Sequence, residues 1–316
     1  MKLITIFLLL ITMSGAFAKN KNLLFLTKDT HLVFFKDIKN GCKSEALKTK
    51  NNCIFIEMNE GNPRLQIRKL KSVMKKNRID GIALAVIKSD FTSLELKRVL
   101  RNKKIPLVTL DADFNKKDLA KNEIKRSSYI GTNNYDLGKT MAQTLLKEHK
   151  ADSHICIISG HSYSDNLNQR IKGFKDVISE KTKNLKYLKR CPLYSLEKPG
   201  AALSQTVHII KDSISINQNI IIAMMGGWAQ DNRGKYISEL SKFRKYFDTN
   251  KVKIISIDTT PNQLKLLNMG LGHLNVGQSP KEIGRTAFKT LLKLINGEKV
   301  EEYIYTPIRV CLPGKC

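Results

Sequence analysis

Short apolar runs alternate with amphipathic runs along the whole chain. The run at 22–27 is typical of a buried strand, and the segment at 34–49 carries apolar residues every three to four positions, as a helix with one buried face does. The alternation predicts strands at 22–27, 53–58, 81–86, 105–111, 129–131, 154–160, 185–194, 219–225, 253–258, 272–277 and 302–311. It predicts helices at 34–49, 63–77, 91–103, 135–149, 169–181, 199–215, 231–246 and 280–296, with a further segment at 260–269.

Strands that alternate with helices predict an α/β fold in which helices cover both faces of a parallel, doubly wound sheet. The length suits two units of about five strands each better than one sheet of about ten. No Pro- or Gly-rich linker separates the halves, so we expect short crossovers between them. The polar segment 113–126 is expected to be irregular and to lie near one crossover.

The N-terminus has the pattern of a secretory signal. Lys2 precedes an apolar run at 3–13, and the small residues of 14–18 end in Ala18. The run is shorter than the about 20 residues that span a bilayer. We therefore expect cleavage after Ala18 and export to the periplasm; an uncleaved anchor or a buried strand is the alternative. The 316 residues are 41% hydrophobic, which is enough to bury a core and excludes a collagen-like or wholly disordered chain.

Six cysteines fit an oxidising compartment and allow fifteen disulfide pairings. The order along the chain hints at the pairing in which each cysteine bonds to the next one. Six free thiols are the alternative, and metal binding is less favoured because no Cys-x-x-Cys or His-x-x-x-His is present. The disulfide candidates are Cys42, Cys53, Cys156, Cys191, Cys311 and Cys316.

The chain has 55 Lys and Arg against 28 Asp and Glu, a formal charge of +27. Such an excess raises nucleic acid as a partner. The lysines are spread along the outer faces of predicted helices, however, and no nucleic-acid-binding motif is present. We expect solvated helix surface and no nucleic acid; an anionic ligand or an anionic membrane surface is the alternative.

Polar and aromatic residues follow the predicted strands. Ligands of open α/β sheets bind beyond the carboxyl ends of the strands. Carboxylates and amides pair with adjacent hydroxyls, and aromatic faces suit the C–H faces of sugar rings, so the set predicts a sugar or polyol site. The alternative for each polar residue alone is a helix N-cap. The residues are Phe34, Phe35, Asp111, Asn134, Trp228, Asp258 and Gln278.

Catalytic interpretations have little support. Gly-x-Ser-x-Gly, His-Glu-x-x-His and Walker motifs are absent. Asp111 and Asp258 are a conceivable glycosidase pair, and Ser159, His161 and Asp165 a conceivable hydrolase triad. We expect no enzymatic activity, no cofactor and no metal, and keep a secreted carbohydrate-active hydrolase as the alternative from another class.

Seven segments in order resemble the type 1 periplasmic binding proteins, in the ribose-binding-like sugar branch, over essentially all of the mature length. The matching segments are Phe34-Phe35 with Gly41, 79–83, 105–111, 129–134 with Gly138, 168–174 with Arg170 and Gly173, Asp258 with Pro261, and 277–284. The resemblance implies two lobes joined by a three-crossover hinge, with ligand in the cleft. It implies a lobe of 19–131 plus 279–306, a lobe of 132–278 plus 307–316, and a signal peptide at 1–18.

The resemblance also implies site residues and partners. Phe35, Asp111, Arg170, Asp258 and Gln278 would contact the ligand, with Asn134 close by; Arg170 enters only through the resemblance. It implies a monomeric periplasmic solute-binding protein that delivers its sugar to the membrane permease of an ABC transporter. A sensor subunit that presents the ligand to a histidine kinase or chemoreceptor is the alternative within the same fold.

Three departures from the pattern bear on the ligand. The ribose-binding member has an Asn ahead of the aromatic pair and an Arg after the first-lobe Asp, where this chain has Leu32 and Ala112. An Asn of the second lobe is replaced by 226–228, in which Trp228 is expected to supply a stacking face. Ribose itself is therefore not expected.

Overall fold

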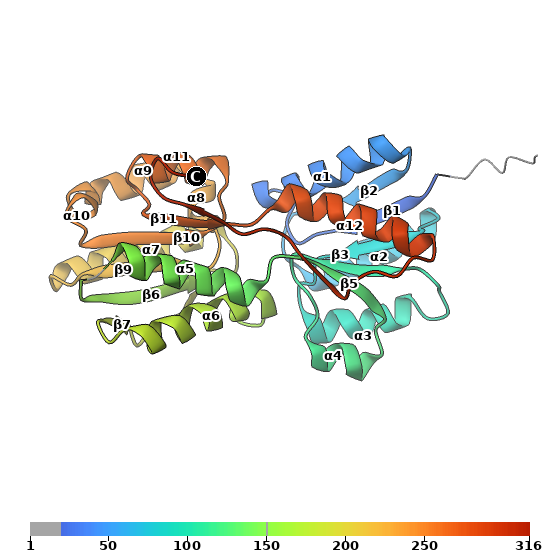
Figure 1. Cartoon of the computed structure of the whole chain (residues 1–316), viewed down its shortest axis with the longest axis horizontal. Helices are drawn as coiled ribbons and strands as arrows, with labels where there is room; N and C mark the ends of the chain where they lie inside the picture. Colours follow the sequence, from blue (N-terminus) through green and yellow to red (C-terminus); the bar gives the residue numbers. More distant parts are fainter. Residues whose placement is uncertain (1–19, 150) are drawn as a thin grey trace, which may run out of the picture.

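The computed structural model describes residues 20–149 and 151–316, so the expected signal peptide lies outside the described residues. The chain forms two lobes side by side, each a sheet with helices on both faces (Figure 1). The predicted α/β fold class is confirmed. Within the described ranges, no helix has the length and apolar character needed to cross a membrane.

Lobe 1 contains a six-stranded parallel sheet in the order β2-β1-β3-β4-β5-β12. Its core lies on both faces, under α1 and α12 on one side and under α2, α3 and α4 on the other. The strands are β1 (Asn22–Leu26), β2 (Asn52–Ile56), β3 (Gly81–Leu84), β4 (Leu107–Leu110), β5 (Arg126–Gly131) and β12 (Tyr303–Tyr305). The helices are α1 (Val33–Thr49), α2 (Pro63–Lys76), α3 (Ser89–Val99), α4 (Lys116–Asn122) and α12 (Pro280–Ile295).

Lobe 2 repeats this order as β7-β6-β9-β10-β11-β13, with β8 also paired to β6 and only β13 antiparallel to its neighbour. α5 and α6 cover one face, and α7 to α11 cover the other. The strands are β6 (Ser153–Ser159), β7 (Leu185–Tyr187), β8 (Leu193–Tyr194), β9 (Ile220–Met224), β10 (Val252–Ile257), β11 (Leu274–Gly277) and β13 (Arg309–Cys311). The helices are α5 (Asn134–Glu148), α6 (Asp165–Lys181), α7 (Pro199–Ser215), α8 (Trp228–Asp231), α9 (Arg233–Leu240), the 3-10 turn η1 (Ser241–Phe243), α10 (Arg244–Asp248) and α11 (Pro261–Asn268).

The chain passes between the lobes three times, from β5 to α5, from β11 to α12 and from β12 to β13 (Figure 1). Each passage is short. The shared strand order puts the carboxyl ends of both sheets at the junction of the lobes, because those ends lead into these passages. The expected single strand at 302–311 is wrong: its two halves pair with different sheets, and Pro307 lies in the gap between them.

A pair of helices packs closely in each lobe, α1 with α12 and α5 with α6. Glycine permits the contact. A Cβ on Gly41 would lie 2.0 Å from the main-chain oxygen of Lys281, and a Cβ on Gly138 would lie 2.0 Å from that of Arg170. The second contact matters for the site, since it fixes the backbone that carries the Arg170 side chain.

Three disulfides bond each cysteine to the next in sequence: Cys42–Cys53, Cys156–Cys191 and Cys311–Cys316. This is the pairing that the order hinted at. The first joins α1 to β2 and the second joins β6 to the loop after β7. A loop of about a dozen residues closed in this way stabilises by about 3 kcal/mol in the chain-entropy model.

Three further element predictions need correction. The expected strand at 185–194 is two short strands, β7 and β8, separated by a loop. The segment 113–126 is not irregular throughout, because it contains α4, which Asn115 caps. The expected helix at 231–246 begins earlier, at Trp228, and is interrupted at Asn232, which caps the next helix.

Candidate ligand-binding site

One pocket lies between the lobes at the carboxyl ends of the two sheets, and both lobes line it. About 560 Å³ within it is not filled by protein atoms, a figure that includes space open to solvent. Its lining is Lys28, Leu32, Val33, Phe34, Phe35 and Asp111 from lobe 1, and Asn166, Leu167, Arg170, Glu197, Gly226, Gly227, Trp228, Asp231, Asp258, Thr260 and Gln278 from lobe 2 and the passage after it.

Asp111 and Asp258 occupy equivalent places in the two lobes. Each follows the fourth strand of its sheet, and each has its backbone in the left-handed region, at φ 59° and φ 77°. The amide of each donates to the next strand, Asp111 to Ile130 and Asp258 to Val276. A backbone conformation of this kind is uncommon outside glycine and concentrates at functional sites.

Neither aspartate is the helix N-cap of its loop. Asn115 caps α4 after Asp111, and Thr260 caps α11 after Asp258 in a capping box with Gln263. The alternative interpretation of these strand-end aspartates as caps is therefore wrong. Both carboxylates line the pocket, and Asp258 also accepts hydrogen bonds there from the Gly227 amide at 3.3 Å and from Gln278 Nε2 at 2.8 Å.

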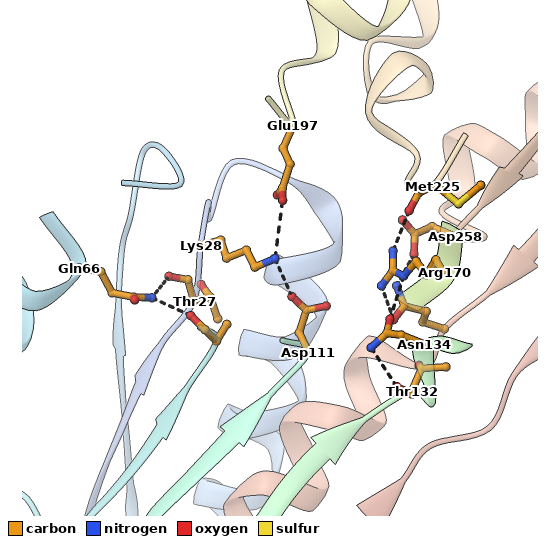
Figure 2. Close-up of polar contacts among 12 residues, drawn as sticks. Thr27, Lys28, Gln66, Asp111, Thr132, Asn134, Arg170, Glu197, Met225 and Asp258 are labelled. Atoms are coloured by element: carbon orange, nitrogen blue, oxygen red, sulfur yellow. Dashed lines mark hydrogen bonds and ion pairs between the residues drawn. The ribbon is translucent and has the colours of Figure 1, made fainter. Parts of the chain in front are cut away.

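A buried lysine links the lobes. Lys28, just after β1, places its ammonium 3.7 Å from Asp111 and 3.6 Å from Glu197 of lobe 2 (Figure 2). Burial raises the pKa of the Asp111 carboxyl, and the charges of Lys28 and Arg170 oppose that rise. One cation thus serves two carboxylates across the junction of the lobes.

Arg170 is the centre of a hydrogen-bond network in lobe 2. Its Nε donates to Asn134 Oδ1 and one terminal nitrogen donates to the Met225 carbonyl, both at 2.8 Å (Figure 2). The other terminal nitrogen donates to Gln278 Oε1 at 3.2 Å, and Gln278 Nε2 donates to Asp258 Oδ1 at 2.8 Å. This network holds the guanidinium and the carboxylate in fixed directions beside the pocket.

Aromatic rings form the apolar part of the wall. Phe34 and Phe35 lie edge to face with ring centres 5.2 Å apart. Trp228 is largely buried at the start of α8 and comes from the opposite lobe. Rings from both lobes are therefore available to the C–H faces of a ligand ring.

All the residues expected to bind ligand line the pocket except Asn134. Asn134 lies behind Arg170, which it orients, and its Nδ2 donates to the Tyr129 hydroxyl and the Thr132 carbonyl. A ligand role for each residue remains a prediction.

Sequence reasoning missed Lys28, Glu197, Asn166 and Asp231. Lys28 obeys the strand-end rule, but one lysine among 55 basic residues is not distinctive. Glu197 lies after the β7–β8 segment, which was expected to be one strand. Asn166 lies in the first turn of α6 and Asp231 at the last residue of α8, and no motif in the sequence distinguishes either of them.

The Ser159–His161–Asp165 form of the hydrolase alternative has no support from geometry. Within the described part of the chain, the buried Ser159 hydroxyl has no hydrogen-bond partner, so no Ser–His pair of a triad forms. A search of the described residues for groups of His, Cys, Asp and Glu that could hold a metal found none.

Comparisons with known proteins agree with the fold. The sequence profile of the periplasmic binding protein domain matches residues 23–299. Ribose import binding protein RbsB of Salmonella typhimurium is 22% identical over 276 residues, 85% of this chain and 82% of that protein.

Two solved structures show the same fold. An ABC transporter solute-binding protein of Agrobacterium vitis bound with α-D-tagatopyranose has a TM-score of 0.82 at 18% identity, covering 93% of this chain and 95% of that chain. The XylFII–LytSN complex has a TM-score of 0.78 at 20% identity, covering 94% of this chain and 99% of that chain.

Proposed function

The chain belongs to the periplasmic binding protein domain family, and from this premise we propose that it binds a sugar or sugar-like polyol between its lobes and delivers it to an ABC importer. One observation carries the proposal. Two aspartates at equivalent strand ends, neither used as a helix cap, line one pocket together with Arg170 and aromatic rings from both lobes.

Each group has a role in holding a polyhydroxylated ligand. The Asp111 and Asp258 carboxylates accept hydrogen bonds from ligand hydroxyls, and the remaining N–H groups of Arg170 donate to ligand oxygens. Phe34, Phe35 and Trp228 cover the C–H faces of the ring. Such a site rejects analogues without the hydroxyls, because its polar groups would be left unpaired.

Binding by both lobes favours a closed form. A ligand shifts a two-state equilibrium only by its differential affinity for the two states. Asp111 reaches the ligand from lobe 1, and Arg170 and Asp258 reach it from lobe 2, so only the closed arrangement satisfies all three. Closure about the three passages then presents the loaded protein to its permease.

Export to the periplasm with cleavage after Ala18, and action as a monomer without enzymatic turnover, belong to this proposal. The RbsB relative is an import binding protein by name. The three disulfides of the chain fit an oxidising compartment.

The second candidate is a sensor subunit that passes the ligand signal to a membrane kinase or chemoreceptor. The observation that favours it is the fold shared with the XylFII–LytSN complex, in which a protein of this fold is bound to another protein. Both candidates use the same pocket and differ in the partner that reads the closed form.

A thermal-shift panel of monosaccharides tests the proposal. Ligand at 100 times its Kd adds about 2.7 kcal/mol to the stability of the folded protein, so at least one sugar should raise Tm by several degrees. No rise with any sugar would contradict the proposal. Disappearance of the stabilising sugar on long incubation would instead favour the hydrolase.

A further inference from the structure

The pocket carries more negative than positive charge. Among the residues that the structure describes, the charged members of its lining are Lys28, Arg170, Asp111, Glu197, Asp231 and Asp258. Two cations stand against four carboxylates, a formal charge of −2. Most of these groups are largely buried, where excess charge of one sign is poorly screened and attracts a counter-charge.

The two cations leave this excess uncompensated. Lys28 alone serves Asp111 and Glu197, at 3.7 and 3.6 Å. Arg170 donates three hydrogen bonds, and all three acceptors are neutral: Asn134, the Met225 carbonyl and Gln278. In the described chain it makes no ion pair within 4 Å with a carboxylate.

Asp231 is the most clearly unpaired acid of the lining. It ends α8, is half-buried, and no described residue gives its carboxylate a hydrogen bond or an ion pair within 4 Å. Burial raises the pKa of Asp231; outside the lining, Lys36 lowers it and Asp29 raises it, so these two neighbours oppose each other. Asp231 thus lines the pocket, and the described residues give its carboxylate neither a hydrogen bond nor an ion pair within 4 Å.

Two further oxygens in the lining lack a donor. Asn166 is 4% exposed and, within residues 20–149 and 151–316, its Oδ1 has no hydrogen-bond partner. Oε1 of Glu197 is buried and also has no hydrogen-bond partner among these residues; the Lys28 ammonium lies 3.6 Å from it. Buried acceptors left without donors cost free energy that a ligand donor recovers.

We propose that the preferred ligand is an amino sugar, whose protonated amine is held by the acceptors that the protein leaves open, with Asp231 the chief one. An ammonium group has three hydrogen-bond donors, no acceptor and a positive charge. It would therefore offset the negative charge of the pocket and also donate hydrogen bonds to the acceptors without partners. Sugar phosphates and uronic acids add negative charge to the pocket and are disfavoured. This inference rests on the proposed sugar-binding function and narrows its substrate class.

Titration calorimetry at pH 7 with matched series tests the inference. Each series holds one amine, its hydroxyl counterpart and its N-acetyl counterpart: D-glucosamine with D-glucose and N-acetyl-D-glucosamine, and the same sets for galactose and mannose. In at least one series the amine should bind at least about tenfold more tightly than both counterparts. Binding of a neutral sugar with the amine equal or weaker would overturn the inference and leave the proposed function standing. Binding of none of the nine would overturn the amino-sugar inference, and the thermal-shift panel of monosaccharides then decides on the proposed function by itself.

Removing the negative charge of Asp231 tests whether this residue holds the ligand amine. In Asp231→Asn, the ratio of neutral-sugar Kd to amine Kd should fall by about tenfold, because the amide keeps an acceptor and loses the charge. Asp248→Asn is the matched control: it removes one negative charge from an exposed ion pair with Arg244 on α10, and the ratio should not change. An unchanged ratio in Asp231→Asn would contradict the role given to Asp231.

Discussion

The basic residue beside Asp111 lies on a different loop in this chain from the one that the resemblance to the ribose-binding branch leads us to expect. The resemblance to the ribose-binding branch places an Arg directly after the first-lobe aspartate, and this chain has a buried Ala112 there. The cation comes instead from Lys28, after β1, 3.7 Å from Asp111. A lysine ammonium is a compact charge and lacks the planar fork of Arg, so we expect it to favour a different arrangement of ligand hydroxyls beside Asp111.

Asp258→Asn tests the most directly oriented carboxylate. The Asn side chain has nearly the same shape as Asp and keeps one oxygen that can accept the hydrogen bond from Gln278, but it carries no negative charge. Sugar affinity should fall by at least about tenfold, since a charged hydrogen bond is worth about 1.5–3 kcal/mol. Calorimetry gives the Kd, and a Tm within a few degrees of wild type excludes unfolding as the cause. Unchanged affinity would remove Asp258 from the site.

If Asp111 binds the sugar as proposed, we expect the affinity to depend on pH. Burial raises the pKa of its carboxyl, and the ionised form is the one that accepts hydroxyl hydrogen bonds on both oxygens. Affinity should be full well above the raised pKa and fall by up to about tenfold per pH unit below it. The Kd measured from pH 7 downward checks this, and Asp111→Asn should flatten the profile. A wild-type profile that matches the variant would contradict it.

His273 makes stability sensitive to acid. Burial is the main cause that lowers its pKa to about 4, and Lys253 and His149 lower it further. The unfolded chain binds the proton near pH 6.5, so the stability contribution is present above that pH and is lost as the pH falls toward 4. Between pH 7 and pH 5, urea unfolding should show about 2 kcal/mol more loss for wild type than for His273→Gln. Equal losses would mean that His273 is protonated in the fold.

At the scale of elements, close packing of two helix pairs holds the backbone that carries the pocket residues in position. α1 and α12 in lobe 1, like α5 and α6 in lobe 2, approach through glycines that the family resemblance also marks. Because α6 carries Arg170, a shift of this helix would displace the guanidinium from Asn134 and Gln278. Helix packing and ligand recognition therefore share one contact.

Gly41→Ala tests the close approach in lobe 1. Its Cβ would lie 2.0 Å from the Lys281 oxygen, so the helices must separate. We expect a loss of about 1–3 kcal/mol in urea unfolding despite the better helix propensity of Ala. Gly200→Ala in α7 is the control, because no atom lies within 4 Å of the added Cβ, and it should be neutral or stabilising. Losses of equal size in both would refute the packing argument.

Periodicity and strand ends predicted most of the fold and much of the pocket lining, since Asp111, Asp258 and Gln278 need only the rule that ligands meet the carboxyl ends of strands. What failed depends on contacts distant in sequence. The apolar run at 302–311 contains no signal that its two halves pair with strands of different sheets. The break between β7 and β8 depends on how each of them pairs with β6. Glu197 meets Lys28 only after both lobes are folded.

For the whole molecule, the two sheets of equal strand order lie in separate lobes that three short passages join (Figure 1). The pocket lined by Asp111 and Asp258 lies between these lobes. The Lys28 pair with Glu197 spans the two lobes. A ligand that contacts Asp111 and Asp258 together adds to this link, and so favours the closed form over an open one.

A crystal structure with the sugar that raises Tm most is the most direct test of this account. We expect the sugar between the lobes, with its hydroxyls on both Asp111 and Asp258 and its ring faces on Phe34, Phe35 or Trp228. A sugar bound elsewhere on the protein, or touching one lobe only, would contradict it.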